Sequence, residues 1–175
     1  MTINYYRCQK NVNRLGTIGI TRPYNLLEHQ YMVAMLFRHF AQKEGIAYDL
    51  DVLERILHHD IVEVVTGDLP YPVKHSSSMT ETAWLVIEKE ALTVHPELQE
   101  YTDDVMERKF TPEQLKLFKM CDLLDLWIFL KEEYGLGNRT EECSVIIARC
   151  ETWILGTFSS IDTYIRNYDK ALLNI

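Results

Sequence analysis

Apolar residues recur at helical spacing along nearly the whole chain, and no segment shows the strict alternation typical of a half-buried strand. Between residues 25 and 44, for example, Leu26, Val33, Leu36, Phe37 and Phe40 share one helical face. Residues 111–134 are apolar on almost all sides, which indicates a central helix or one covered by a partner. With no repeat and no linker, the pattern predicts one all-α domain over residues 1–175, built as a bundle of about six to seven helices.

Cap signals set the expected helix boundaries. Asn25 with Glu28 forms a capping box, and Gly45 gives a stop signal. Thr111 followed by Pro112 is a strong start, because proline is favoured at the first helical position. We expect helices over residues 3–14, 25–44, 49–66, 78–93, 96–108, 111–134 and 140–173, the last with a bend near Gly156.

Composition and charge restrict the class of partner. The chain is 47% hydrophobic and 25% charged, as in ordinary globular proteins, with a net charge of −8 and no run of lysine or arginine. Nucleic-acid binding depends on neutralising many phosphates, so we expect no nucleic-acid polymer as partner. A small phosphorylated substrate needs only a local basic pocket and stays possible.

Compartment follows from what the sequence lacks. The segment from Met1 to Arg14 is polar and tyrosine-rich, unlike a signal peptide, and the longest apolar run is far too short to span a bilayer. The four cysteines show no C-x-x-C pairing and are interpreted as reduced thiols. We therefore expect a cytoplasmic protein with no membrane contact.

Residues 59–74 carry the most informative chemistry. His59-Asp60 and Glu63 are expected on or near one face of a helix, and Gly67 leads into a loop that contains Asp68 and, at its end, a lysine. Imidazole and carboxylate together suit a borderline divalent metal, and a lysine suits phosphate. This stretch alone predicts a metal and a phosphate near each other.

Further ligands are available on two other helices. Asp122 and Asp125 lie three residues apart in the apolar helix, where a carboxylate is costly unless it is compensated. His29 lies early in the helix that Asn25 begins. Two imidazoles and two carboxylates would leave room around a six-coordinate ion for water and substrate oxygens, as metal-assisted attack on phosphorus requires.

The order of these residues resembles the HD-domain metal phosphohydrolases. The longer match resembles the bacterial 5′-deoxynucleotidases and, equally, the related phage deoxynucleoside triphosphohydrolases, including dATP-specific ones; a phage-encoded enzyme would act in the cytoplasm of its bacterial host. The residues that carry this resemblance are Arg14, Glu28-His29, His59-Asp60 with Glu63, Thr66-Gly67-Asp68-Leu69-Pro70 with Pro72-Val73-Lys74, and Lys119 with Asp122.

The resemblance implies a role for each position. Glu63 is the candidate general acid/base and Asp68 assists proton transfer, although Glu63 in an outer supporting position is the alternative. Asp122 is favoured over Asp125 as a ligand because Lys119 precedes it by one turn. The implied metal ligands are His29, His59, Asp60 and Asp122, and the implied phosphate contacts are Arg14, Lys74 and Lys119.

One departure concerns the nucleoside pocket. The monophosphate-cleaving relatives usually carry tryptophan after the equivalent of Arg14, where this chain has Leu15. We assign Leu15, Thr17 and Pro72 to the base and sugar pocket. Because Leu15 weakens the monophosphatase match and three cations suit a triphosphate tail, the sequence favours a deoxynucleoside triphosphohydrolase, with dATP preferred. A 5′-deoxynucleotidase is the alternative, followed by a catalytically silent nucleotide-binding module.

The cofactor and the assembly are expected in outline only. Zn, Mn, Co, Ni and Fe(II) all fit two histidines and two aspartates, and a second divalent ion could enter with the deoxynucleotide substrate. The apolar run Trp127-Ile128-Phe129 and the long final helix favour a homo-oligomer.

Overall fold

The protein, as a computed structural model, is described over residues 3–69, 77–102, 105 and 108–172. These residues form helices and contain no strand, which confirms the all-α prediction. None of their helices is long and apolar enough to cross a membrane. The elements are α1 (Ile3–Cys8), η1 (Gln9–Asn11), α2 (Leu26–Glu44), α3 (Leu50–Ile56), α4 (Glu63–Thr66), α6 (Ser78–Val94), η2 (Pro96–Tyr101), α8 (Pro112–Gly135), α9 (Glu141–Ile154) and α10 (Ser159–Leu172).

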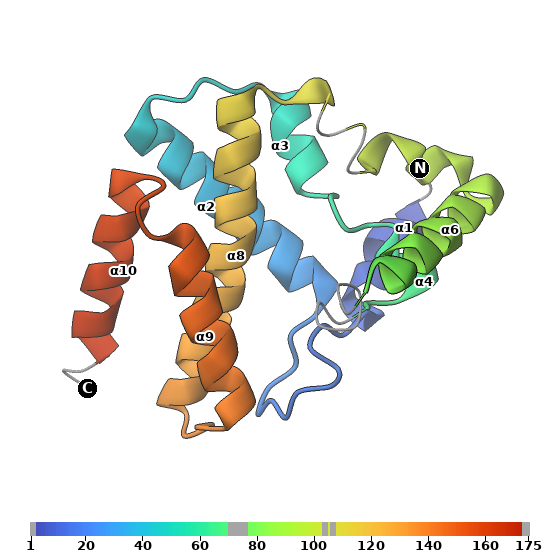
Figure 1. The fold of residues 1–175 in the computed structure, drawn as a ribbon. Coiled ribbons are helices and arrows are strands. Elements are labelled where there is room, and N and C mark those ends of the chain that lie inside the picture. The colour runs from blue at the N-terminus through green and yellow to red at the C-terminus, as the bar shows by residue number, and fades with distance from the viewer. Residues whose placement is uncertain (1–2, 70–76, 103–104, 106–107, 173–175) are drawn as a thin grey trace.

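Helices α2 and α8 form the centre of the main core. They cross each other, and α9 and α10 cover the side of α8 away from α6 (Figure 1). Both central helices begin at the caps expected from the sequence: the Asn25 side chain accepts from the Glu28 N–H, and Thr111 forms a capping box with Gln114. Gly45 ends α2 in the left-handed conformation that glycine tolerates best.

A second, smaller apolar cluster lies on the other side of the molecule. Ile61, Leu98 and Tyr101 are its buried members, and they pack among the elements around α4 and η2. Helix α6 runs along this side (Figure 1) and buries one of its large apolar side chains, Trp84. This side of the fold is therefore held by far less apolar packing than the α2–α8 core.

Two long predicted helices are in fact broken. The expected helix over residues 49–66 consists of α3 and α4 with turns between them, so His59 and Asp60 lie on a turn. With its amide turned so that the oxygen faces this turn, Gln30 accepts the N–H groups of Asp60 and Ile61 at 2.9 and 3.1 Å. It gives the Asp60 N–H the acceptor that an unbroken helix would supply, while the Ile61 N–H also donates to the His58 carbonyl at 3.0 Å. The last helix is divided at Gly156, whose φ is +81°.

The structure also corrects smaller points. Helix α1 ends at Cys8 and a 3-10 turn follows, so the helix predicted over residues 3–14 is too long; Ser77, one residue earlier than expected, caps α6. Trp127, Ile128 and Phe129 are all buried inside the chain's own core, so they form no exposed patch for an oligomer. The four cysteines are free thiols, as expected.

Candidate active site

Three side chains from three segments converge on one point. His29 comes from α2, His59 from the turn after α3 and Asp122 from α8, and their ligand atoms all lie within 4.8 Å of one another. The His29 Nε2 atom is 3.1 Å and the His59 Nε2 atom 3.9 Å from Asp122 Oδ1. Asp60 adds its Oδ2 atom 3.7 Å from His29 Nε2 and 3.3 Å from His59 Nε2. The structure thus brings together all four predicted metal ligands.

A buried pair holds the His29 ring. Asp125 Oδ2 lies 2.8 Å from His29 Nδ1, and the Tyr24 hydroxyl donates to the same oxygen at 2.6 Å. Asp122 and Asp125, one turn apart on α8, thus face the two different nitrogens of one imidazole. This geometry separates the two candidates that spacing alone left open, because only Asp122 lies on the Nε2 side with the other ligands.

His59 is fixed by the backbone. Its Nδ1 atom is 2.8 Å from the carbonyl oxygen of Ile56, which can only accept, so Nδ1 carries a proton and the neutral form of His59 has its lone pair on Nε2. The Nε2 atoms of both His29 and His59 are buried and make no hydrogen bond. Two inward-facing imidazole nitrogens without a partner, beside two carboxylates, fit a divalent cation.

Electrostatics agree with a cation at this point. Burial lowers the pKa of His59, but the carboxylates of Asp60 and Asp122 outweigh it and raise that pKa to about 9. Burial raises the pKa of Asp60, yet His59 and Arg14 together keep it well below the usual range. The cluster therefore attracts positive charge, which a bound metal ion would supply directly.

Arg14 and Glu63 lie beside the ligands. Arg14 Nη1 donates to Asp60 Oδ2 at 2.5 Å and lies 3.7 Å from Glu63 Oε2. Burial and the nearby charge of Asp60 raise the pKa of Glu63 well above its ordinary value, although Arg14 opposes this. Glu63 Oε2 is buried without a hydrogen bond. A carboxyl group with a raised pKa beside a candidate metal site suits a general acid/base.

Asp68, the residue after Gly67, lies near Arg14 and Asp60. Burial raises its pKa, while Arg14 and a hydrogen bond from the Leu15 backbone N–H act in the opposite direction. Gly67 has a φ of +77°, a conformation that turns the chain away from α4 and that a side chain would strain. Asp68 and Leu15 are therefore neighbours across the site.

The remaining predicted residues are less closely tied to this point. Lys119 is exposed on α8 one turn before Asp122, and Thr17 is exposed on the loop after Leu15. Lys74 and Pro72 lie outside the described residues. The assignments of these four residues stay predictions.

Sequence reasoning missed the groups that orient the ligands. Tyr24, on the connection before α2, and Gln30, next to His29, are both buried. Gln30 also donates to the Leu57 carbonyl and the Gln9 amide, each at 3.1 Å. The available signal for Gln30 was a polar residue beside a predicted ligand at the start of an apolar helix; nothing in the sequence marked Tyr24.

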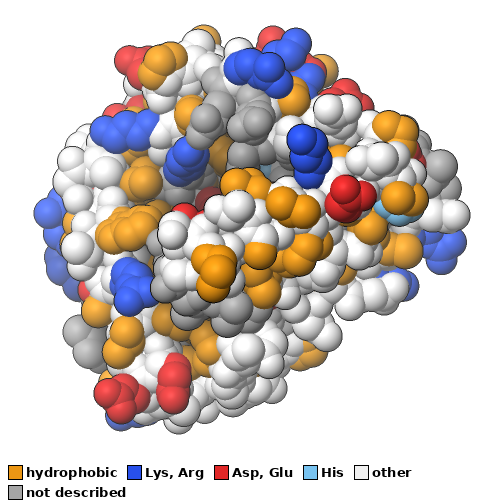
Figure 2. Space-filling view, turned by 45° about the vertical axis from the view of Figure 1, so that its right-hand side comes forward, with side chains coloured by type: hydrophobic (Ala, Val, Ile, Leu, Met, Phe, Trp, Pro, Cys, Tyr) orange, Lys and Arg blue, Asp and Glu red, His pale blue; other side chains and the backbone are white. Residues whose placement is uncertain are grey.

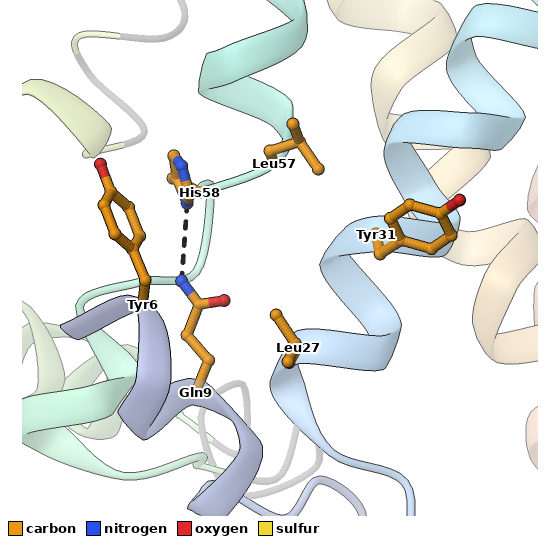
Figure 3. A pocket seen from close by; sticks show the side chains of 6 residues that line it. All are labelled: Tyr6, Gln9, Leu27, Tyr31, Leu57 and His58. Atoms are coloured by element: carbon orange, nitrogen blue, oxygen red, sulfur yellow. Dashed lines mark hydrogen bonds between the residues drawn. The ribbon is translucent and has the colours of Figure 1, made fainter. Parts of the chain in front are cut away.

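A separate pocket of about 250 Å³ lies on the outer side of the His58–Asp60 turn. Gln9 and His58 lie next to each other in its wall, with Gln9 Nε2 3.5 Å from His58 Nδ1, and Tyr6, Leu27, Tyr31 and Leu57 complete the lining (Figure 3). Burial lowers the pKa of His58, and its ring lies 4.7 Å from that of Tyr6. His58 thus packs with aromatic neighbours and lies outside the cluster of His29, His59 and Asp122.

Comparisons with known proteins agree with this geometry. The HD phosphohydrolase DatZ of cyanophage S-2L, solved with dA and one catalytic Zn²⁺ ion, matches with a TM-score of 0.67 and 19% identity over 100% of this chain and 98% of its own. An HD-domain phosphohydrolase from Listeria innocua matches with a TM-score of 0.77 and 17% identity over 98% of this chain and 88% of its own. These two likenesses show that the chain has the fold of the HD-domain phosphohydrolases.

Sequence similarity narrows the class. The family described as 5′-deoxynucleotidase YfbR-like matches residues 3–152. The 5′-deoxynucleotidase YfbR of Escherichia coli O1:K1 and the 5′-deoxynucleotidase of Cronobacter sakazakii are each 33% identical over 140 residues, covering 74% of this chain and 70% of the relative. The chain belongs to the YfbR-like 5′-deoxynucleotidase family. These findings support the monophosphatase alternative better than the triphosphohydrolase favoured by the sequence.

Proposed function

We propose that this enzyme hydrolyses deoxynucleoside 5′-monophosphates to a deoxynucleoside and orthophosphate. The observation that carries the proposal is the pair of buried Nε2 atoms of His29 and His59, which face Asp122 without hydrogen-bond partners, in a chain of this family. The residues proposed to hold one divalent ion, of Zn, Mn, Co, Ni or Fe(II), are His29, His59, Asp60 and Asp122. Such an ion, when bound, supplies Lewis acidity and lowers the pKa of water.

Other side chains around the proposed ligands are assigned to proton transfer and to phosphate binding. Glu63, whose pKa burial raises, serves as the proton carrier for the attacking water. Asp68 assists proton transfer at the reacting phosphate, because its carboxyl is half-buried on the same side as Arg14. Arg14 neutralises phosphate oxygens; for this its guanidinium exchanges part of its contact with Asp60 for the substrate.

Lys74 and Lys119 complete the proposed phosphate contacts. Lys119 has support from its place on α8, one turn before Asp122. Thr17 and Pro72 stay assigned to the nucleoside pocket with Leu15, and a second divalent ion bound with the substrate stays a prediction. The cytoplasm is the proposed compartment, since deoxynucleotide pools are found there.

A substrate panel tests the proposal. The purified protein is incubated with each deoxy- and ribonucleoside 5′-monophosphate and with dATP, in Mn²⁺ or Co²⁺, and the released phosphate species are identified. We expect orthophosphate from deoxynucleoside monophosphates, loss of activity with a chelator, and recovery on adding metal. Inorganic triphosphate from dATP, with dAMP left intact, would instead support the triphosphohydrolase.

The same panel separates an enzyme from a silent nucleotide-binding module. A module would bind nucleotide and metal without releasing any phosphate species. The carboxyl groups of Glu63 and Asp68 favour the enzyme, because binding alone needs no proton carrier beside the metal ligands.

We also propose that the chain forms a homo-oligomer through α6. On this helix Leu85, Val86 and Ile87 are 62%, 55% and 49% exposed, respectively. Figure 2, in which this side of the molecule comes forward, shows hydrophobic side chains gathered near its centre. Light scattering tests the proposed homo-oligomer. Leu85→Asp should lower the molar mass in solution. Val145→Asp, at a 50% exposed apolar position on α9, should leave the molar mass unchanged.

A further inference from the structure

The segment between the site and α2 is a closed loop. Its two ends pair through the Arg14 N–H, which donates to the Tyr24 carbonyl at 2.7 Å, and the Leu26 N–H, which donates to the Val12 carbonyl at 2.9 Å. Residues 15–23 leave the site and return to it between these pairs. Figure 1 shows this blue segment descending to the end of α8 and the start of α9.

Glu133, near the end of α8, holds the far part of this loop. The Thr21 N–H donates to Glu133 Oε2 at 2.6 Å and the Thr21 hydroxyl donates to Oε1 at 2.7 Å. Asn138 donates both to Glu133 Oε2 at 3.0 Å and to the Gly19 carbonyl at 2.7 Å. The Glu133 side chain is fully buried. A fully buried carboxylate with this many donors fixes its partners, because breaking the set leaves a charge without solvation.

The near part of the loop contacts the catalytic groups. Leu15 has a φ of +58°, a left-handed conformation that a leucine adopts only when its surroundings impose it. Its N–H bonds to Asp68 and its carbonyl accepts from the Ile18 N–H at 2.9 Å. The strained residue therefore lies between the phosphate-binding Arg14 and the part of the loop that Glu133 fixes.

We propose that Glu133 is a positioning residue for nucleoside selection, which holds residues 15–22 so that Leu15 and Thr17 meet the sugar and base of the substrate. The inference rests on the proposed function for its substrate. In that function Arg14 is proposed to take the phosphate, and the predicted nucleoside pocket places Leu15, the next residue, beside the adjoining deoxyribose. Glu133 itself contacts neither the metal ligands nor the substrate; it acts through Thr21 and Asn138.

Glu133→Gln tests this with Glu132→Gln as the matched control. Glu132 is the preceding residue, is 43% exposed and pairs with Arg22. In Glu133→Gln we expect the KM for deoxynucleoside monophosphates to rise about tenfold and the preference for deoxy- over ribonucleotides to shrink, since the Thr21 and Asn138 donors lose part of their buried acceptor. Turnover of p-nitrophenyl phosphate, which has neither sugar nor base, should stay unchanged in Glu133→Gln. The Glu132→Gln variant should keep wild-type turnover and KM on all substrates.

Thr21→Val is a second, milder variant, because it removes one hydroxyl from an exposed residue and does not threaten the fold. It should shift KM in the same direction by a smaller factor. Equal losses on nucleotides and on p-nitrophenyl phosphate, or an unchanged preference for the deoxy sugar in both variants, would overturn the proposal.

Hydrogen exchange separates this inference from the proposed function. In the wild type the Ile18 amide should exchange slowly, and in Glu133→Gln markedly faster, whether or not any nucleotide is hydrolysed. A wild type that releases no phosphate from any deoxynucleotide would refute the proposed function alone. Unchanged exchange across residues 15–22 would refute the role of Glu133.

Discussion

The two sides of this molecule are packed very differently, and the active site draws on both. His29 and Asp122 project from α2 and α8, the helices at the centre of the large core. Glu63 and Asp68 belong to the side whose buried apolar cluster consists of Ile61, Leu98 and Tyr101. The comparison teaches that two of the four groups proposed to bind metal, His29 and Asp122, depend on the strongly packed helices, whereas the proposed proton-carrying groups lie where local opening costs less.

The largest expected effect separates the two sets of groups by function. Glu63→Gln keeps the shape of the side chain but cannot exchange a proton, so turnover should fall by about 10²–10⁴-fold. Metal content, measured by atomic emission, should stay at the wild-type level. Loss of the metal in this variant would place Glu63 among the ligands and weaken the comparison.

Stability tests the difference in packing. Leu124 is fully buried in the large core, and Leu98 is 1% exposed in the small cluster. Leu124→Ala should lower the free energy of unfolding by about 2–5 kcal/mol. The loss in Leu98→Ala should lie at or below the lower end of this range, because fewer neighbours surround the cavity. Urea unfolding followed by circular dichroism measures both. Equal costs would show that the two clusters are equally well packed.

Which features of the fold the sequence could predict depends on how many residues separate the partners of each interaction. The caps at Asn25 and Thr111 were predictable because the bonds they make span three residues. The break before His59 was not, because it depends on Gln30, which lies about thirty residues away in the chain. The four proposed metal ligands were assigned through the resemblance, and that assignment stays a prediction.

The orientation of these proposed ligands could not be predicted from the sequence. Asp122 and Asp125 have the same residue type and helical face, and only their contacts with different nitrogens of His29 distinguish them. Tyr24 has no signal at all, since its role depends on reaching Asp125 from a loop.

A moderate effect on metal affinity is expected when the partner of His29 Nδ1 in the large core is changed. Asp125→Asn leaves the four proposed ligands in place but weakens the partner of His29 Nδ1. Affinity for Mn²⁺ or Zn²⁺, measured by competition with a chelating dye, should fall by about 10–100-fold, as is usual when the outer partner of a ligating histidine is changed. Wild-type affinity would show that the α2–α8 packing alone orients the ring.

The smallest expected effect is a pH dependence at Glu133. Burial raises the pKa of this carboxyl, but the hydrogen bonds from Asn138 and Thr21 outweigh it, so the folded-state pKa lies below the ordinary value. The ionised form therefore stabilises the fold above the unfolded pKa, and this contribution is lost as pH falls through the folded pKa.

Glu133→Gln, which does not titrate, should thus be about 1–2 kcal/mol less stable than the wild type at neutral pH, with the gap closing in acid. Urea unfolding at several pH values measures the gap. A difference that stays constant with pH would mean that the charge of Glu133 contributes nothing to holding the loop.

The paired ends of the loop over residues 15–23 have an evolutionary consequence. Because Arg14 and Leu26 are fixed by backbone bonds to Tyr24 and Val12, residues inside the loop can be inserted, deleted or exchanged without displacing Arg14 or the start of α2. Under the proposed role of this loop, exchanges within it would change the nucleoside that is accepted, while Arg14 and the start of α2 keep their places. Substrate range and hydrolytic chemistry would then be largely separable traits, apart from the contact between Leu15 and Asp68.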